Sequence, residues 1–111
     1  MENKITVKDI LSLKNKRKIT MLTAYDYPLA SLEDRCGIDM ILVGDSLANV
    51  VLGPDSTTKV GMQEMIHHAK AVTRAVTHAL VIGDMPFESY QLHPDDAVNN
   101  ARRFIDDAKC G

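Results

Sequence analysis

Two apolar stretches of this chain end in a glycine that is followed at once by an acidic side chain. The first leads to Asp45, which is followed by the hydroxyl of Ser46, and the second leads to Asp84. Both stretches are typical of buried strands, and in parallel α/β sheets chemistry takes place beyond the carboxyl ends of the strands. Two aspartates that leave neighbouring strands at the same edge supply the carboxylate oxygens that a hard cation binds.

A single aspartate at a strand end is more often a turn or helix-capping residue. The repetition on two strands, with a helix between them, favours the functional interpretation. Because neighbouring strands lie about 4.8 Å apart, we expect the carboxylates of Asp45 and Asp84 within roughly 10 Å of each other.

The elements that position these acids alternate along the chain. Apolar residues at helical spacing and short β-branched runs predict a short helix followed by three strand–helix units. The predicted helices are residues 7–14, 28–35, 62–76 and a last one from Pro94 to a stop at Gly111, and the predicted strands are residues 19–24, 38–43 and 79–82. Residues 47–52 fit either a helical turn or a short strand, and residues 53–58 are typical of a loop.

Capping residues and apolar faces add detail to these helices. The predicted caps are Thr6 paired with Asp9, Asp26, Gly61 with Glu64, and Gly37 as a left-handed stop. The second helix is predicted to face inward through Leu29 and Leu32, with Cys36 as a further candidate for that face. The last helix has an apolar stripe of Ala97, Val98, Ala101, Phe104, Ile105 and Ala108.

Alternation with connections of this length implies an α/β fold whose parallel strands are joined by right-handed crossovers. A (β/α)₈ TIM barrel takes about 250 residues, whereas this chain has 111. Residues 1–111 are therefore expected to be a single partial barrel domain, namely three β/α units preceded by a short helix and truncated at the carboxyl end. The apolar face of the last helix then needs a neighbour.

Composition excludes several classes of protein. The chain is 45% hydrophobic with a net charge of −2, so no basic field favours nucleic acid or an anionic membrane. No segment approaches the roughly 20 apolar residues of a membrane span. Cys36 and Cys110 are too few for a disulfide framework, and we expect a reducing cytoplasm. His67 and His68 are adjacent on a helix and point in different directions, so metal binding by both is disfavoured.

Four motifs in register resemble the ketopantoate hydroxymethyltransferase family. They are Thr23-Ala24-Tyr25-Asp26, Val43-Gly44-Asp45-Ser46-Leu47, Gly53-Pro54-Asp55-Ser56-Thr57 and Asp84-Met85-Pro86-Phe87-Glu88-Ser89-Tyr90. The resemblance covers residues 8–111. It implies a (β/α)₈ barrel of the phosphoenolpyruvate/pyruvate type, a homo-oligomer, and Mg²⁺-dependent transfer of a one-carbon unit from 5,10-methylenetetrahydrofolate to 3-methyl-2-oxobutanoate.

The resemblance also implies roles for particular residues. Asp45 and Asp84 match the metal-binding aspartates, and together with Ser46 they match positions that contact the keto acid. Tyr25 matches a pocket tyrosine. A 2-oxo acid can chelate Mg²⁺ through a carboxylate oxygen and the keto oxygen, and the ion then stabilises the enolate formed when the C3 proton leaves.

The chain departs from the family pattern in two ways. Ala48-Asn49, Gly61 and Glu88 stand where the family commonly has Gly-Met, threonine and an apolar residue. The family's next strand carries a substrate-binding lysine and a further acid, and its glutamate base lies later still. No residue of this chain matches them, and Lys109 is not assigned to the role. No catalytic residue is therefore assigned, and we expect the isolated chain to be inactive.

Three alternatives remain open at this point. A relative of the phosphoenolpyruvate mutase and isocitrate lyase group would share the barrel, the metal and 2-oxo acid chemistry. A serine hydrolase is suggested by Gly44-Asp45-Ser46-Leu47, but it needs a histidine base late in the chain, where only His93 stands without an aspartate two or three residues before it. The third alternative is a non-catalytic fragment.

Overall fold

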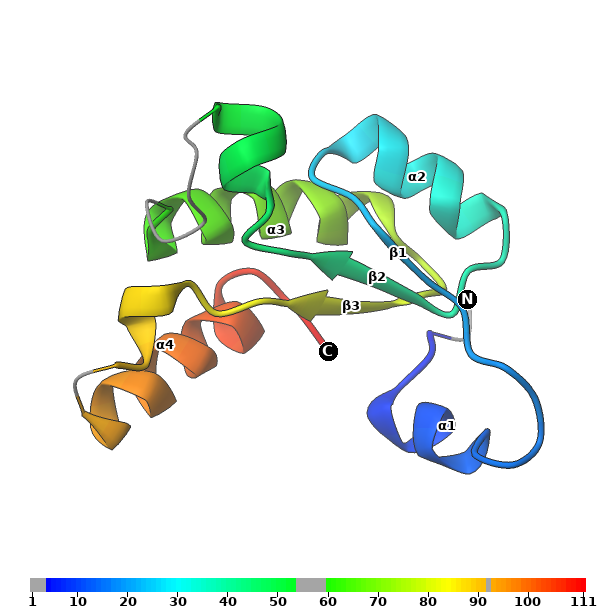
Figure 1. Cartoon of the computed structure of the whole chain (residues 1–111). Coiled ribbons are helices and arrows are strands. Elements are labelled where there is room, and N and C mark those ends of the chain that lie inside the picture. Colours follow the sequence, from blue (N-terminus) through cyan, green and yellow to red (C-terminus); the bar gives the residue numbers. More distant parts are fainter. Residues whose placement is uncertain (1–3, 54–59, 92) are drawn as a thin grey trace.

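The computed structural model describes residues 4–53, 60–91 and 93–111. Its elements follow the predicted alternation of helices and strands (Figure 1). They are α1 (Val7–Ser12), β1 (Met21–Thr23), α2 (Tyr27–Arg35), β2 (Met40–Val43), a π-helical turn η1 (Ala48–Leu52), α3 (Met62–Ala75), β3 (Leu80–Gly83), a 3₁₀ turn η3 (Phe87–Ser89) and α4 (Pro94–Asp106). None of the described helices is long and apolar enough to cross a membrane.

The three strands form one parallel sheet in the order β1-β2-β3, as predicted. In the register, Thr23 pairs with Leu42 and Val43 pairs with Gly83, so the carboxyl ends of the strands lie at one edge. Helices α2 and α3 pack against each other and both contact β2, whereas α1 stands apart from the sheet (Figure 1). The expected α/β arrangement of three successive strand–helix units is confirmed for the described residues.

The core lies between β2, β3 and the long helix α3. Ile41 and Val43 of β2 are fully buried, and they alternate with half-buried residues because one face of the sheet is covered by helices. Helix α3 adds Met65, Ala69 and Val72, which keep the helical spacing of its buried stripe. All three residues of β1, which is an edge strand of the sheet, are exposed.

The helix caps follow the sequence prediction. Thr6 and Asp9 form a reciprocal capping box, and the Leu29 amide donates to Asp26 Oδ1 over 3.0 Å. The Gly61 amide donates to Glu64 Oε1 over 3.0 Å. Gly37 has a φ of +84°, the left-handed conformation that ends a helix without a Cβ penalty. The segment left open, residues 47–52, is mostly the π-helical turn. Of the predicted loop 53–58, residues 54–58 lie outside the described residues.

The inward face predicted for α2 is wrong. Leu29 and Leu32 are 42% and 52% exposed, and Cys36 is also exposed. The helix instead buries Asp34, which is only 7% exposed and accepts hydrogen bonds from the backbone of residues 77–79. Those amides need an acceptor inside the structure, and the carboxylate that satisfies them determines which side of α2 faces the core.

The predicted stop of the last helix at Gly111 is also wrong. Helix α4 ends at Asp106, and Lys109 turns the chain with a φ of +63°. The Gly111 amide then donates to the carbonyl oxygen of Val81 over 2.9 Å, which extends the backbone pairing beyond β3. Gly111 is therefore not a helix stop, because the chain has already turned back along the sheet.

The apolar stripe of the last helix is only partly buried. Phe104 and Ala108 are in the core, at 3% and 0% exposure. Val98 and Ile105, by contrast, are 53% and 50% exposed. The expectation that this face needs a neighbour agrees with the exposure of these two side chains.

The basic turn at residues 15–18 makes a specific contact with the entry of β2. The guanidinium of Arg17 donates two hydrogen bonds of 2.8 Å to the carboxylate of Asp39. Asp39 is 3% exposed and also accepts from the Thr20 amide over 2.9 Å. These bonds join the entry of β1 to the entry of β2, at the edge of the sheet opposite the predicted site.

Candidate functional site

The two aspartates of the predicted metal site come together at the carboxyl edge of the sheet. The Asp84 amide donates to the carbonyl oxygen of Val43 over 3.0 Å, which continues the pairing of β3 with β2. The Asp45 amide in turn donates to Asp84 Oδ2 over 3.1 Å. The predicted juxtaposition is thus confirmed, because the Asp84 carboxylate lies against the backbone of Asp45.

The electrostatics of this pair are unfavourable in the absence of a cation. Burial raises the pKa of Asp45, and the charge of Asp84 and hydrogen bonding between the two side chains raise it further. Both residues are half-buried, so the carboxylates remain accessible. A nearby dication would remove the repulsion, and half-buried carboxylate oxygens are suitable ligands for one.

The number of protein ligands is small. Among the described residues no group of three or more histidine, cysteine, aspartate or glutamate side chains is placed to hold a metal ion. Two carboxylates are nevertheless compatible with Mg²⁺, which commonly keeps several waters and binds through one or two carboxylates and substrate oxygens. The donor set of Asp45 and Asp84 therefore fits Mg²⁺ better than a metal that needs a complete cage of protein ligands.

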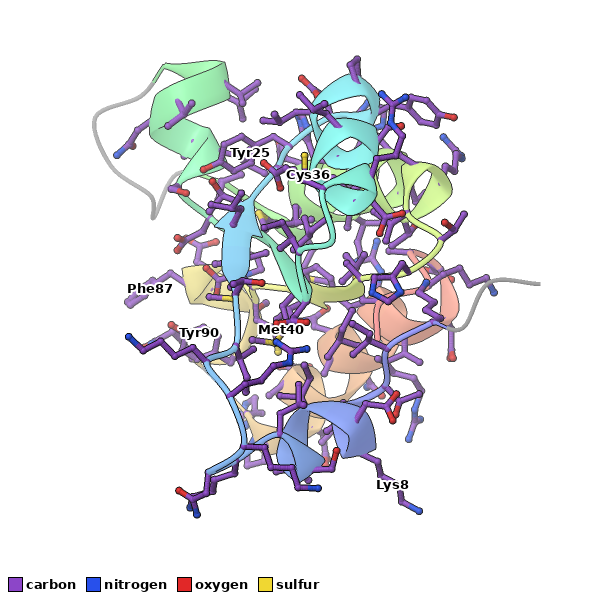
Figure 2. All side chains as sticks on the ribbon, turned by 90° about the vertical axis from the view of Figure 1, so that its right-hand side faces the viewer. Lys8, Tyr25, Cys36, Met40, Phe87 and Tyr90 are labelled. Atoms are coloured by element: carbon purple, nitrogen blue, oxygen red, sulfur yellow. The ribbon has the colours of Figure 1, made fainter. Side chains whose placement is uncertain are left out.

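A pair of hydroxyl groups lies beside the carboxylates. Tyr25 follows the end of β1, on the side of the sheet away from α1 (Figure 2), and its Oη is 2.6 Å from Ser46 Oγ. Both side chains are half-buried. One hydroxyl proton bridges the two oxygens, and the other remains available to an acceptor. The hydroxyl partner of Ser46 is thus Tyr25, where a serine nucleophile would need a histidine base.

One residue near this pair was not assigned a role from the sequence. His68 Nδ1 is 2.7 Å from the carbonyl oxygen of Tyr25. The only sequence signal for a role of His68 was its position on α3, one residue before the buried Ala69. The preceding residue, His67, is exposed. The two histidines do point differently, with their rings nearly perpendicular.

A surface cavity of about 560 Å³ opens beside α3 and includes His68 in its lining. Most of its lining residues have polar or charged side chains, and they come mainly from α3, with Arg103 from α4. The lining residues are Leu52, Gln63, Glu64, Ile66, His67, His68, Lys70 and Arg103. None of the four predicted site residues is among them.

Comparisons with known proteins agree with the sequence motifs. Residues 4–111 match the family model described as ketopantoate hydroxymethyltransferase. A protein from Syntrophobacter fumaroxidans named 3-methyl-2-oxobutanoate hydroxymethyltransferase is 58% identical over 109 residues, which make up 98% of this chain and 39% of that protein. The protein of that name from Syntrophomonas wolfei is 62% identical over 97 residues, or 87% of this chain and 35% of that protein.

The similarity is not confined to those two organisms. A protein of the same name from Ignicoccus hospitalis is 56% identical over 103 residues, which are 92% of this chain and 39% of that protein. The chain therefore spans less than two-fifths of the length of these curated relatives.

Proposed function

Because this chain belongs to the ketopantoate hydroxymethyltransferase family, we propose that it forms part of an enzyme acting on 3-methyl-2-oxobutanoate. The reaction transfers a hydroxymethyl group from 5,10-methylenetetrahydrofolate to this keto acid and gives 2-dehydropantoate, a precursor of pantothenate. The names of the relatives support this activity. The structural observation that carries the proposal is the contact between the Asp84 carboxylate and the Asp45 backbone at the carboxyl edge of the sheet.

We propose further that the three strand–helix units belong to a (β/α)₈ barrel. Two features of the sheet support this. Every residue of β1 is exposed, including the apolar Met21 and Leu22, so this edge strand is free to pair with a further strand. Beyond β3, the Gly111 amide already donates to Val81 in the manner of a further strand. The homo-oligomer implied by the resemblance stays a prediction.

In this proposal Asp45 and Asp84 hold Mg²⁺ together with oxygens of the keto acid and water. When bound, the ion supplies Lewis-acid polarisation of the substrate's keto group. The task of the two aspartates is to fix the position of that charge relative to the sheet. The Asp84 amide bonds to the Val43 carbonyl and the Asp84 carboxylate accepts from the Asp45 amide, so the backbone of the two strand ends anchors the Asp84 side chain.

Ser46 and Tyr25 would bind the carboxylate of the keto acid. If the Tyr25 hydroxyl donates to Ser46 Oγ, the Ser46 proton is free to donate to a substrate oxygen next to the metal site. The short Oη–Oγ distance of 2.6 Å supports such an arrangement, because it orients the serine hydroxyl before the substrate arrives. No base is assigned, so proton removal from C3 is not attributed to this chain alone.

A paramagnetic metal tests the proposed cation site on the chain itself. Mn²⁺ prefers similar oxygen ligands to Mg²⁺ and broadens the amide NMR signals of nearby residues. We expect the amides of Asp45, Ser46 and Asp84 to broaden first, and excess Mg²⁺ to reverse the effect. Asp84→Asn should abolish this site-specific broadening, since it keeps the shape and removes one anionic ligand.

The matched control is Asp95→Asn, which changes an exposed acid in the first turn of α4. It should leave the Mn²⁺ response of the strand-end amides unchanged. Broadening that is centred elsewhere, or that survives Asp84→Asn, would contradict the proposed metal site.

Substrate chemistry gives a second test. Deuterium exchange at C3 of 3-methyl-2-oxobutanoate, followed by proton NMR with Mg²⁺ and without folate, isolates proton removal from one-carbon transfer. The chain alone should give no exchange above the metal-only rate. Exchange that is faster, and is abolished by Asp84→Asn, would contradict the assignment of the base to another part of the enzyme.

An intact family enzyme that contains this segment should separate the roles of the site residues. Asp45→Asn and Asp84→Asn should both reduce Mg²⁺ binding and turnover sharply, because a hard dication depends on anionic ligands. Ser46→Ala should cost less, about 0.5–1.5 kcal/mol for a neutral hydrogen bond and somewhat more if the partner is charged. A larger loss for Ser46→Ala than for Asp84→Asn would reverse the proposed roles.

A further inference from the structure

His68 is joined to the candidate site by a single, well-defined contact. Its Nδ1 is 2.7 Å from the carbonyl oxygen of Tyr25. A carbonyl oxygen only accepts hydrogen bonds, so Nδ1 must carry the proton. In the neutral ring this fixes one tautomer, with Nε2 left as an acceptor.

The residue that receives this hydrogen bond lies at a transition in the backbone. The Ala24 amide still donates to Leu42 of β2, over 3.1 Å, and Asp26 already caps α2. Tyr25 therefore stands between the last residue of the strand pairing and the first residue of the helix cap. The contact from α3 fixes its peptide group from a third direction.

The orientation of this peptide group matters because Tyr25 has a long side chain. Its hydroxyl is placed 2.6 Å from Ser46 Oγ, and Ser46 is the neighbour of Asp45. A small rotation of the Tyr25 backbone would be enlarged at the hydroxyl and would lengthen or break this short contact. His68 is half-buried, and its hydrogen bond to the Tyr25 carbonyl gives its ring a defined position.

We propose that His68 is a positioning residue, which holds the Tyr25 carbonyl so that the Tyr25 hydroxyl stays on Ser46. It acts through Tyr25 and does not itself touch the keto acid or the cation. This role in substrate binding rests on the proposed function of the site as a 2-oxo acid site. The positioning of the hydroxyl pair does not depend on that function and can be measured without any ligand.

The first measurement uses the unmodified chain. Nitrogen-15 NMR of the neutral His68 ring should give a protonated Nδ1 and an unprotonated Nε2. A ring protonated at Nε2 would overturn the proposal, because it could not donate to Tyr25. This experiment needs no substitution, so it is decisive even if every variant of His68 fails to fold.

The second measurement compares two substitutions. His68→Phe keeps a ring of similar size and removes the donor, whereas His68→Asn retains an N–H at a place comparable to Nδ1. We expect His68→Phe to shift or broaden the ring signals of Tyr25 and the Cβ signal of Ser46, and His68→Asn to restore them. His67→Phe, on the exposed neighbouring position, is the matched control and should leave both residues unchanged.

A folded His68→Phe protein with unchanged Tyr25 and Ser46 signals would overturn the proposal, as would a failure of His68→Asn to restore signals that His68→Phe has shifted. Binding of 3-methyl-2-oxobutanoate in the presence of Mg²⁺, measured by ligand NMR, then tests the functional part. We expect His68→Phe to weaken binding about two- to tenfold, the effect of one neutral hydrogen bond. If the unmodified chain binds no keto acid while the tautomer and rescue results hold, the proposal that Tyr25 and Ser46 of this chain bind the keto acid fails and the positioning role stands.

Discussion

Replacing Asp34 with asparagine should lower the free energy of unfolding by about 2 kcal/mol, and replacing it with alanine by about 4 kcal/mol. The Asp34 carboxylate accepts from the amides of Thr77, His78 and Ala79 over 2.9, 3.2 and 2.8 Å, and from the Thr77 hydroxyl over 3.2 Å. These bonds join α2 to the segment that enters β3. Asp34 is only 7% exposed, so water cannot easily replace the carboxylate.

The two magnitudes follow from which donors lose their partner. Asparagine keeps one oxygen and can still serve one side of the carboxylate, but its NH₂ group then faces donors on the other side. Alanine leaves all the donors without an acceptor, and the Ala79 amide belongs to a fully buried residue, so its loss costs most. Thr77 is exposed and can turn to water, which limits the total.

Urea denaturation followed by circular dichroism at neutral pH measures both changes. Asp106→Ala, which removes an exposed acid at the end of α4, is the control and should stay within about 0.5 kcal/mol of the unmodified protein. Equal midpoints for Asp34→Ala, Asp34→Asn and the unmodified protein would refute the reasoning that this carboxylate supports the buried backbone.

The pH dependence of stability provides a second check on Asp34. Burial raises its pKa, but hydrogen bonds from Ala79, Thr77 and His78 lower it by more, so the pKa in the folded protein lies below its ordinary value. Its contribution is therefore fully present above the unfolded-chain pKa of about 3.9 and is lost as the pH falls through the folded value. Asp34→Asn should lose less stability than the unmodified protein on acidification. Parallel acid profiles would contradict this.

Three further substitutions test other features of the fold by urea denaturation. A Cβ at Gly83 would overlap the ring of Phe104, so Gly83→Ala should cost about 1–3 kcal/mol, and an unchanged midpoint would contradict the tight packing of α4 on β3. One carboxylate oxygen of Glu33 is buried with no hydrogen-bond partner in the described part of the chain, and burial raises the pKa of this group. Glu33→Leu should therefore stabilise the protein by about 1 kcal/mol at neutral pH, and by less as the pH falls and the glutamate becomes protonated. A loss of stability would count against this. Arg17→Met should lower the urea midpoint because it leaves the buried carboxylate of Asp39 without its bidentate partner, and an unchanged midpoint would mean that solvent replaces the pair.

The features of the fold that were predicted correctly from the sequence follow from general rules for strand order, strand ends and helix caps. Parallel strands in chain order follow from the alternation of strands and helices with connections of this length. The meeting of Asp45 and Asp84 follows from their common position after the apolar run, since parallel strands end at the same edge. Caps such as Asp26 also follow, because the side chain bonds to its own helix. These inferences need only the order of the segments and their local pattern, and not the identity of a particular long-range contact.

The wrong and missing predictions have a common physical origin in long-range polar contacts. Periodicity ranks residues by hydrophobicity, so it assigned Leu29 and Leu32 to the core side of α2, whereas Asp34 is buried by donors more than 40 positions away. His68 likewise depends on a backbone carbonyl in another strand–helix unit. The end of α4 at Asp106 was missed because its apolar spacing continues to Ala108 after the backbone has left the helix.

The carboxylates of this chain differ in how fully the protein satisfies them, and this difference separates structural from functional acids. Asp34 and Asp39 lie toward the amino edge of the sheet, and each accepts several hydrogen bonds that hold its pKa below the ordinary value. Asp45 lies at the carboxyl edge beside Asp84, and burial together with that neighbour raises its pKa instead. A buried carboxylate that accepts several hydrogen bonds stabilises the fold. A half-buried pair of carboxylates that repel each other instead costs stability until a cation neutralises their charge. Such a cost is expected where a site is built to bind a positive ion. For this reason we propose the strand-end pair, and not the fully hydrogen-bonded acids at the opposite edge, as the Mg²⁺ site.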